Sequence, residues 1–448
     1  MPDRSDRRQF LRVLGGAGVV GLAGCTGGDG GSDGGSGDGG SDGGSGDGES
    51  DGGSGDGGSG DGGGAERTIQ YGVLLPLTGD LGSVGTPMRD AAVLPTTLLE
   101  GEDLGGISVE NQVEDTQTDP SSGISAANAL INAGIPGVCG PASSGVNIQV
   151  ANQVFIPNQI VGCSPSSTAP TVTNLEDDDF IFRTAPSDAL QGQVMAQVAN
   201  ENLGVSSAAT LYVNNDYGQL LSQAFTDAFE SADGTVQTQT SFEKAQSSYT
   251  SKLQSALSDS PDLLVIIGYP ESGTQMFLDY YADFEGEEQI MVTDGLKDSK
   301  MQQQIGNPME NVIGTAPLPS GPASEAFASA FEEEYGEAPG IFTAHSFDAS
   351  AVLVLANARA GENSGPAVRD AMREVANPGG TEVSVENMAE GVRMAAAGEE
   401  IQYVGASSSV DFDDNGDMSA VSYEVWEFAP DTESGFETVN TVEFSGSN

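Results

Sequence analysis

Two loops rich in serine and threonine follow consecutive predicted strands and offer a site for an anionic ligand. The first is Gly140–Gly145 and the second is Ser164–Pro170. Hydroxyl groups donate hydrogen bonds, and a helix that begins in such a loop adds unpaired backbone N–H groups and a partial positive charge. Together the loops could bind a carboxylate without Lys or Arg. Ser and Thr are also the usual helix N-caps, so either loop alone would be weaker support.

Side chains that could catalyse a reaction are scarce. The chain has one histidine, His345, and on a predicted helix it fits a packing or surface role better than proton transfer. The sequence contains no Gly-x-Ser-x-Gly motif, and its His and Cys residues cannot assemble a zinc site. We therefore expect a protein that is not an enzyme and that uses no cofactor or metal.

The segment Asp411–Asp417 imitates the start of a calcium-binding loop. It places Asp, Asp, Asn and Gly at positions 1, 3, 5 and 6, but position 12 is Ser422 instead of a bidentate Glu. Predicted strands also flank it, where a calcium loop of this kind has helices. A polar hairpin turn is the preferred interpretation, with a calcium site as the alternative.

These loops need a framework, and the hydrophobic pattern predicts alternating strands and helices. The first series comprises strands Thr68–Leu75, Ile107–Val113, Ile135–Cys139 and Gln159–Cys163 and helices Pro87–Leu99, Ser121–Asn132 and Val146–Val154. The second comprises helices Asp188–Asn202, Gly218–Ser231 and Tyr249–Leu257 and strands Ala208–Val213, Thr235–Phe242 and Leu263–Gly268. Such alternation indicates parallel sheets covered by helices on both faces. Ligands in these folds bind beyond the carboxyl ends of the strands.

The remainder adds three helices and a β-rich tail. The predicted helices are Ala323–Tyr335, Thr343–Ala360 and Ala367–Val375, and the predicted strands are Ser407–Phe412, Ser422–Phe428 and Thr438–Phe444. We expect an α/β fold of two doubly wound, Rossmann-like domains. Cys139 and Cys163 end two predicted neighbouring strands, and we expect both to be buried and reduced, because adjacent parallel strands rarely suit disulfide geometry.

Composition points to a salt-adapted surface. The chain has 67 acidic and 15 basic residues and a formal net charge of -52. Such self-repulsion destabilises a compact state in dilute buffer, but the Debye length falls to roughly 3 Å in molar salt. A polyanionic surface for a basic ligand or calcium is the less favoured alternative. Nucleic acid is excluded as a partner, because phosphate binding requires clustered Lys and Arg.

The first 65 residues carry targeting signals. Arg7 and Arg8 open a paired-arginine export signal, and the apolar run of residues 13–23 is too short for a membrane span of about 20 residues. The small residues before Cys25 match a lipoprotein cleavage site, which predicts a signal peptide at residues 1–25 and lipid on Cys25. Residues 26–65, mostly Gly, Ser and Asp, are typical of a disordered linker. We therefore expect an extracytoplasmic protein, lipid-anchored to the outer face of the cell membrane.

Five ordered motifs resemble those of the branched-chain amino-acid-binding proteins of ABC importers. They are Gly72–Gly79, Glu114–Pro120, Gly140–Ser144, Phe182–Asp188 and Asn215–Gly218. The resemblance covers about residues 67–430. It implies the type I periplasmic-binding fold, with two lobes joined by a three-segment hinge. We expect residues 66–185 and 318–418 to form the N-terminal lobe, and residues 186–317 and 419–448 to form the C-terminal lobe.

The resemblance also implies the roles of individual residues. Ser144, Ser166, Ser167 and Thr168 would hold a ligand carboxylate, with Thr168 and the Ser166 carbonyl also near the amino group. Asp294 would receive the ammonium, although an Asp before Gly is commonly just a turn former. Tyr217 and Tyr269 would form aromatic walls, or simply pack at strand ends. Two further positions depart from the family pattern: Val84 stands where an aromatic ring is frequent, and Phe347 where Tyr is frequent.

The sequence thus predicts a monomeric lipoprotein that binds an amino acid, branched-chain or hydrophobic, between its lobes and delivers it to an ABC permease. A ligand sensor or chemotaxis receptor of the same fold is the first alternative. A binder of amides or urea-type solutes is the second, because relatives of this fold bind such compounds.

Overall fold

The computed structural model describes residues 67–284, 288–432 and 434–445. Arg7, Arg8 and Cys25 lie outside these residues, so the predicted export signal, lipid anchor and linker stay predictions. Within the described ranges, no helix combines the length and hydrophobicity that crossing a bilayer requires.

The first lobe is built on a five-stranded parallel sheet in the order β2-β1-β3-β4-β5. Its strands are β1 Arg67–Leu75, β2 Ile107–Asp115, β3 Gly137–Cys139, β4 Val161–Ser164 and β5 Ile181–Arg183. The helices between them are α1 Gly82–Leu99, α2 Pro120–Asn132, α3 Ser144–Val150 and α4 Ile156–Asn158, with a π-helical segment at Ala151–Phe155 and a 3-10 turn at Val172–Asn174. The β-α alternation predicted for this part is confirmed.

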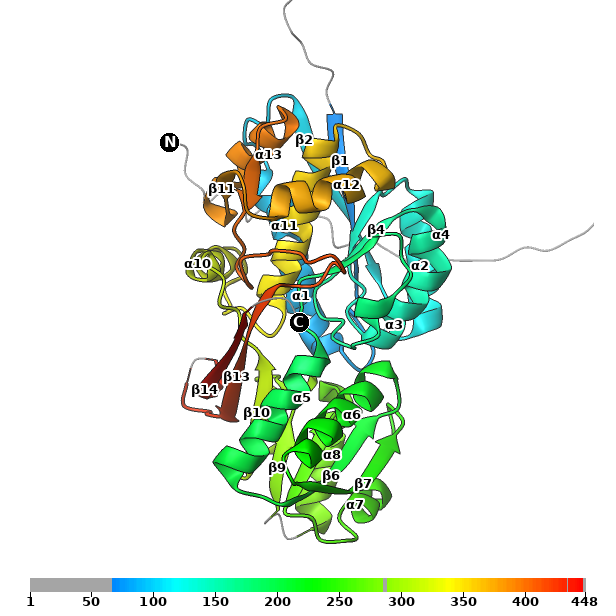
Figure 1. Cartoon of the computed structure of the whole chain (residues 1–448), viewed down its shortest axis with the longest axis vertical. Coiled ribbons are helices and arrows are strands. Elements are labelled where there is room, and N and C mark those ends of the chain that lie inside the picture. Colours follow the sequence, from blue (N-terminus) through cyan, green and yellow to red (C-terminus); the bar gives the residue numbers. More distant parts are fainter. Residues whose placement is uncertain (1–66, 285–287, 433, 446–448) are drawn as a thin grey trace, which may run out of the picture. The chain divides into compact units, whose positions relative to one another are not determined.

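Successive side chains of β1 point to opposite faces of the sheet. Tyr71 and Val73 pack in the core that includes α1 and α11 (Thr343–Ala360), whereas Leu74 packs in a separate core with Leu130 of α2 and Val146 of α3. Helix α11 lies against β1 and β3 (Figure 1) and is buried along nearly its whole length. Helix α11 is thus an interior helix, and it supports the sheet whose strand ends carry both serine loops.

The second lobe contains a seven-stranded sheet in the order β14-β13-β10-β9-β8-β6-β7. Its strands are β6 Ser207–Val213, β7 Thr235–Phe242, β8 Leu263–Ile267, β9 Gln289–Val292, β10 Val312–Pro317, β13 Ala420–Phe428 and β14 Phe436–Ser445; β13 is antiparallel to β10, and β14 is antiparallel to β13. Its helices are α5 Asp188–Gln197, α6 Asp216–Ser231, α7 Thr250–Ala256, α8 Pro270–Asp283 and α9 Met301–Ile305, with a π-helical segment at Val198–Leu203. All five residues of β8 are buried, as a central parallel strand between two helical layers requires.

The chain returns to the first lobe between β10 and β13. This return contains α10 Ser324–Tyr335, α11, α12 Gly365–Ala376 and α13 Met388–Ala396, a short parallel pair β11 Thr381–Val383 and β12 Ile401–Tyr403, and a 3-10 turn at Val385–Asn387. Neither β11, β12 nor α13 was predicted, because each is short and flanked by polar sequence.

The predicted strand Ser407–Phe412 is wrong. Backbone groups in this segment bond to a buried carboxylate instead of a neighbouring strand: Asp348 Oδ1 accepts from the Ala406 N–H (2.9 Å), and Oδ2 accepts from the Ser407 N–H (2.7 Å). Tyr403 donates its hydroxyl proton to Asp348 as well (2.7 Å). A buried backbone N–H needs a hydrogen-bond acceptor. Here the Asp348 carboxylate is that acceptor, in place of the neighbouring strand that the alternating pattern predicted.

Three segments connect the two lobes: residues 184–187 after β5, 318–323 after β10, and 404–419 before β13. Backbone hydrogen bonds link the third segment to the end of β5 and to the second segment. The Arg183 N–H donates to the Gly416 carbonyl (3.0 Å), and the Ser320 N–H donates to the Ser407 carbonyl (3.0 Å). The third segment therefore bonds both to Arg183, the last residue before the first segment, and to the second segment.

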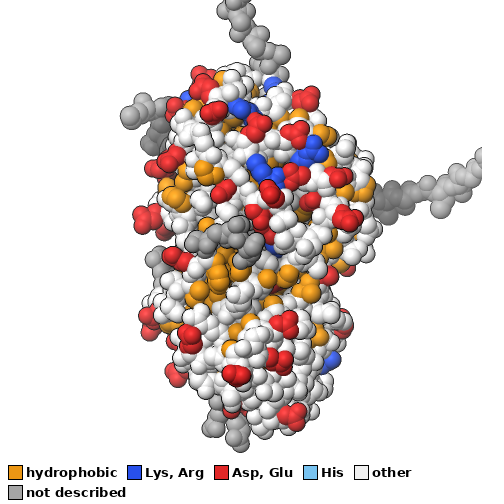
Figure 2. Space-filling view, viewed as in Figure 1, with side chains coloured by type: hydrophobic (Ala, Val, Ile, Leu, Met, Phe, Trp, Pro, Cys, Tyr) orange, Lys and Arg blue, Asp and Glu red, His pale blue; other side chains and the backbone are white. Residues whose placement is uncertain are grey.

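The surface carries the acidic excess of the sequence. On the face shown in Figure 2, Asp and Glu side chains are spread over all of the described surface, and Lys and Arg are few. Salt adaptation stays a prediction from this acidic excess.

Candidate functional site

The two serine loops lie side by side because β3 and β4 are neighbours in the sheet, with Cys139 paired to Cys163 in register. Both cysteines are buried, and neither forms a disulfide. Hydroxyl groups tie the loops together: Ser164 donates to the Pro141 carbonyl (2.6 Å), and Ser166 donates to the Ala142 carbonyl (3.2 Å). The loops therefore form one polar surface at the carboxyl edge of the sheet.

Ser144 and Thr168 keep hydrogen-bonding capacity that the loops do not use. Ser144 Oγ accepts from the Ala169 N–H (3.2 Å), which leaves its own proton free to donate elsewhere. The Ser167 hydroxyl is buried without a hydrogen-bond partner among the described residues. The buried Thr168 hydroxyl forms no bond of good geometry either, but it lies close enough to Asp188 to lower the pKa of that carboxyl. Buried polar groups normally find partners, so unused groups at this edge are typical of a surface that awaits a polar ligand.

Asp294 begins a 3-10 turn two residues after the end of β9 and is only 3% exposed. Its Oδ1 accepts from Gln191 Nε2 (2.9 Å) and from the Tyr217 hydroxyl (3.0 Å). Burial raises the pKa of Asp294 to about 6, with these two hydrogen bonds opposing the rise. Near neutral pH this side chain is a buried anion with little solvation, which favours an incoming cationic group.

A second buried carboxylate accompanies Asp294. Asp188 begins α5, where its N–H donates to the Thr168 carbonyl (2.8 Å), and neither carboxylate oxygen has a hydrogen-bond partner among the described residues. Burial, and then the charge of Asp294, hold the pKa of Asp188 well above its ordinary value. Because two nearby buried carboxylates resist double ionisation, the charge on Asp294 opposes ionisation of Asp188.

Sequence reasoning missed Asp188 and Gln191. Ser187 caps α5 by accepting from the Ala189 N–H (3.4 Å), so Asp188 resembles an ordinary acidic residue in the first turn of a helix. The usable signal is spacing: Asp188 and Gln191 are three residues apart and so share a helix face. Both side chains are fully buried. A polar pair on the buried face of a helix that begins at a hinge deserves a functional interpretation.

Tyr217 and Tyr269 form an aromatic wall beside Asp294. Their rings stack with centroids 5.6 Å apart and an interplanar angle of 11°. The Tyr269 hydroxyl also reaches the first lobe, where it lies 3.2 Å from Ser143 Oγ, and it accepts from Asn215 Nδ2 (2.9 Å). The wall thus belongs to the second lobe and contacts the serine loop of the first.

These groups surround a small cavity between the lobes. Its lining comprises Leu81, Val84, Met88, Ala142, Ser143, Ser144, Ser166, Tyr217, Tyr269, Asp294, Gly295, Ile341 and Phe342. The free volume is about 30 Å³, which is room for about one water molecule. The cleft is therefore closed in this structure, and a ligand can enter only if the lobes part.

The structure brings together most of the predicted site residues. Ser144, Ser166, Tyr217, Tyr269, Asp294 and Val84 line the cavity, and Ser167 and Thr168 are buried in the same loop as Ser166. Phe347 does not line it. It lies in the core with its ring centroid 5.2 Å from that of Phe327, while Ile341 and Phe342, just before α11, form the apolar wall. The helical register turns Phe347 inward, which the sequence alone did not reveal.

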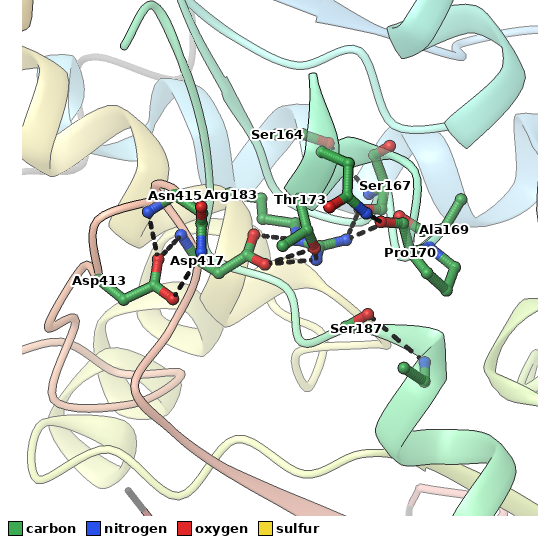
Figure 3. Close-up of polar contacts among 12 residues, drawn as sticks. Ser164, Ser167, Ala169, Pro170, Thr173, Arg183, Ser187, Asp413, Asn415 and Asp417 are labelled. Atoms are coloured by element: carbon green, nitrogen blue, oxygen red, sulfur yellow. Dashed lines mark hydrogen bonds and ion pairs between the residues drawn. The ribbon is translucent and has the colours of Figure 1, made fainter. Parts of the chain in front are cut away.

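In the turn that resembles a calcium loop, acidic side chains are engaged in hydrogen bonds and an ion pair with other residues of the protein (Figure 3). Asp413 Oδ1 accepts from the N–H groups of Asn415 (2.8 Å) and Asp417 (3.0 Å), and Asp417 forms an ion pair with Arg183. Among the described residues, no group of three or more His, Cys, Asp or Glu side chains could hold a metal ion. The hairpin-turn interpretation accounts for this segment.

Comparison with known proteins gives one family. Residues 68–397 match the family model described as periplasmic binding protein. The relatives include a chemotactic signal transduction system substrate-binding protein of Halobacterium salinarum, 27% identical over 359 residues that cover 78% of this chain and 84% of the relative. A leucine-, isoleucine-, valine-, threonine- and alanine-binding protein of Pseudomonas aeruginosa is 23% identical over 69% of this chain and 83% of that protein.

Solved structures show the same fold. A leucine-binding protein from Thermotoga maritima aligns with a TM-score of 0.70 at 23% identity and covers 84% of this chain and 98% of its own. A branched-chain amino-acid transporter substrate-binding protein from Streptococcus pneumoniae, solved with isoleucine, aligns with a TM-score of 0.68 at 17% identity and covers 84% and 99%. At these identities the likeness concerns the fold alone.

Proposed function

Because this chain belongs to the periplasmic binding protein family and has its type I α/β fold with two parallel-sheet lobes, we propose that it binds a small amino acid between those lobes. The family consists of binding proteins, not enzymes. The observation that carries the proposal is Asp294, a buried carboxylate at the cavity wall, held by Gln191 and Tyr217 and facing the serine loops across the cleft. A zwitterionic ligand complements both sides of the cleft, with its ammonium toward Asp294 and its carboxylate toward the serine loops.

Charge matching supports a ligand with one ammonium group. Asp294 is an anion near neutral pH, whereas burial and the charge of Asp294 raise the pKa of Asp188 and oppose a second negative charge, so a ligand with a single ammonium complements the pair. On the opposite side, Ser144 and Thr168 offer donors to a carboxylate. An isolated anion would leave Asp294 buried and unpaired, which is strongly unfavourable. This argues against simple aromatic acids, although one solved neighbour from Rhodopseudomonas palustris holds 3,4-dihydroxybenzoic acid.

The wall of the cavity supports a hydrophobic side chain. Leu81, Val84, Met88, Ile341 and Phe342 face it, and all are buried. Burying an aliphatic side chain of the ligand against them contributes roughly 1.5–3 kcal/mol. Leucine, isoleucine and valine therefore fit better than polar amino acids or urea-type solutes, which have no apolar group to bury.

We further propose that binding closes a lobe of residues 66–185 and 318–418 on a lobe of residues 186–317 and 419–448. Besides the contact between Ser143 and Tyr269, Ser272 Oγ donates to Asp80 Oδ1 (2.7 Å) across the closed cleft. Closure buries the ligand and gives a surface that a membrane permease can recognise. The proposed role is solute delivery to an ABC permease by a monomer tethered through lipid on Cys25 after twin-arginine export.

A second role is favoured by the relative from Halobacterium salinarum, which is described as part of a chemotactic signal transduction system. The same closed, ligand-bound form could instead be read by a membrane signal transducer. Deletion of the gene separates the two roles: loss of amino-acid uptake supports transport, and loss of chemotaxis with normal uptake supports sensing.

A thermal-shift screen in molar KCl tests the binding proposal. We expect leucine, isoleucine or valine to raise the unfolding temperature, and benzoate and urea to leave it unchanged. Stabilisation by benzoate without any response to amino acids would overturn the assignment.

A further inference from the structure

Arg183 is the most completely bonded side chain near the site, and the binding scheme above does not use it. It ends β5, is 1% exposed, and engages all three of its guanidinium nitrogens. Nε and Nη2 pair with the two carboxylate oxygens of Asp417 at 2.5 and 2.7 Å. Nη2 also donates to Thr173 Oγ1 (2.7 Å), which in turn donates to Asp417 Oδ2 (2.7 Å).

The remaining nitrogen reaches the second serine loop. Arg183 Nη1 donates to the carbonyls of Ser167 (3.2 Å) and Ala169 (3.1 Å). Figure 3 shows the guanidinium between Asp417 on one side and this loop on the other. Arg183 therefore connects the third lobe-connecting segment, which contains Asp417, to the loop that contains Thr168.

The contact with Ser167 fixes the direction of a backbone donor. In a planar trans peptide the C=O of one residue and the N–H of the next point in opposite directions. Because the Ser167 carbonyl is turned toward Arg183, the Thr168 N–H is turned away from it. That N–H makes no hydrogen bond within the described part of the chain. It is therefore a free backbone donor of fixed orientation in the loop that faces the cleft.

The hydrogen bond from Arg183 to Ala169 also affects Ser144. Arg183 holds the Ala169 carbonyl and so restrains Ala169, whose N–H donates to Ser144 Oγ. With its oxygen accepting that bond, Ser144 directs its own proton elsewhere. One guanidinium thus restrains two neighbouring groups suited to an anion, the Thr168 N–H and the Ser144 hydroxyl, without contacting the cavity itself.

We propose that Arg183, held by Asp417, is a positioning residue that orients these donors toward the carboxylate of the ligand. The proposal rests on the amino-acid binding proposed above. Asp417 is needed because a buried guanidinium without its counter-ion is strongly unfavourable and would abandon this geometry. The acidic turn that resembles a calcium loop thus acts as the anchor of the carboxylate-binding loop.

Calorimetric titration of Asp417→Asn with L-leucine and L-leucinamide in molar KCl separates positioning from general stability. The amide keeps the ammonium and side chain but has no carboxylate. We expect leucine affinity to fall roughly tenfold or more and leucinamide affinity to change less than about threefold. Equal loss for both probes, or no loss for either, would overturn the proposal. If Asp417→Asn does not fold, Thr173→Val removes only the bridging hydroxyl. This variant should likewise lower the ratio of leucine affinity to leucinamide affinity.

Glu424→Gln is the matched control. Glu424 also forms a buried ion pair, with Lys297, whose side chain is 15% exposed while that of Glu424 is 5% exposed. Both residues belong to the second lobe, and among the described residues their side chains form hydrogen bonds only with each other and with Thr438. Loss of the pair should therefore lower stability and leave the ratio of leucine to leucinamide affinity unchanged. A changed ratio in Glu424→Gln would contradict the proposal, because the ratio would then report stability alone.

Hydrogen exchange of the ligand-free protein tests the same point without any ligand. Asp417→Asn should speed amide exchange in residues 164–170, and Glu424→Gln should not. If wild type binds neither probe, the proposed function fails, and the exchange arm still decides whether Arg183 orders this loop. Unchanged exchange in Asp417→Asn would overturn the positioning role even if leucine binds.

Discussion

Gln191 Nε2 lies 2.9 Å from Asp294 Oδ1, and the same nitrogen lies 3.2 Å from the carbonyl of Thr315. The amide therefore fixes the carboxylate against the backbone of β10 in the sheet of the second lobe. Because Asp294 accepts the side-chain hydrogen bonds of Gln191 and Tyr217 through Oδ1, Oδ2 accepts no side-chain hydrogen bond from the described residues that would compete with a ligand. The proposed ammonium site is thus pre-oriented before a ligand arrives.

Asp188→Asn should change amino-acid affinity much less than Asp294→Asn. If the raised pKa of Asp188 keeps it protonated near neutral pH, the amide replaces a neutral acid of the same shape. We expect a loss below about tenfold, equivalent to one hydrogen bond. Isothermal titration at pH 7 measures this. A loss as large as that of Asp294→Asn would show that Asp188 carries the charge.

Acidification should weaken binding while stabilising the ligand-free protein. Asp294 has a pKa of about 6, above the value near 3.9 of an unfolded chain. Protonation below pH 6 removes the anion, so affinity should fall about tenfold by pH 5.

The stability effect has the opposite sign. Between about pH 4 and 6 the folded state binds the Asp294 proton more tightly than the unfolded chain does, so stability rises as the pH falls through this window. Asp348, also with a pKa of about 6, contributes in the same direction. Chemical unfolding of wild type and Asp294→Asn from pH 4 to 7 isolates the contribution of Asp294 to the change in unfolding free energy, which we expect to be about 1–3 kcal/mol. A contribution of the opposite sign would refute the raised pKa of Asp294.

The sequence predicted the framework well and the details of the cleft less well. Strand–helix alternation is a strong local signal, so strands β1 to β4 and β6 to β8 could be located, whereas the three-residue β5 was missed. Ser407–Phe412 could not, because its pairing with Asp348 depends on a residue about 60 positions away. Phe342 precedes α11 and lines the cavity, whereas Phe347 lies within α11 and faces the core, and the burial of Asp188 depends on packing between lobes. Long-range contacts, more than local propensity, decide these positions.

Tyr269→Phe should weaken closure selectively. The change removes the hydroxyl that contacts Ser143 of the first lobe and Asn215 of the second, while the stacked ring stays. We expect ligand affinity to fall roughly five- to tenfold through a faster off-rate. Stopped-flow kinetics measures that rate. Tyr281→Phe, which removes a hydroxyl bonded to Asn311 within the second lobe (2.8 Å), is the control and should leave the off-rate unchanged.

Cys25→Ser should release the protein from the membrane without changing its affinity. The predicted lipid attaches to the Cys25 sulfur, and the binding residues lie in the folded part of the chain. Cell fractionation with immunoblotting measures the release, and titration of the released protein measures affinity. Retention of Cys25→Ser in the membrane fraction would contradict the lipid-anchor prediction.

The central claim is that Asp294 recognises the ammonium of a zwitterionic ligand. The most direct measurement is a calorimetric comparison of L-leucine with 4-methylpentanoate, which lacks only the amino group, for wild type and Asp294→Asn in molar KCl. We predict that wild type prefers leucine by about 100-fold or more and that Asp294→Asn, still folded by circular dichroism, loses most of this preference. Equal affinity of wild type for the two compounds, or an undiminished preference in Asp294→Asn, would contradict the account.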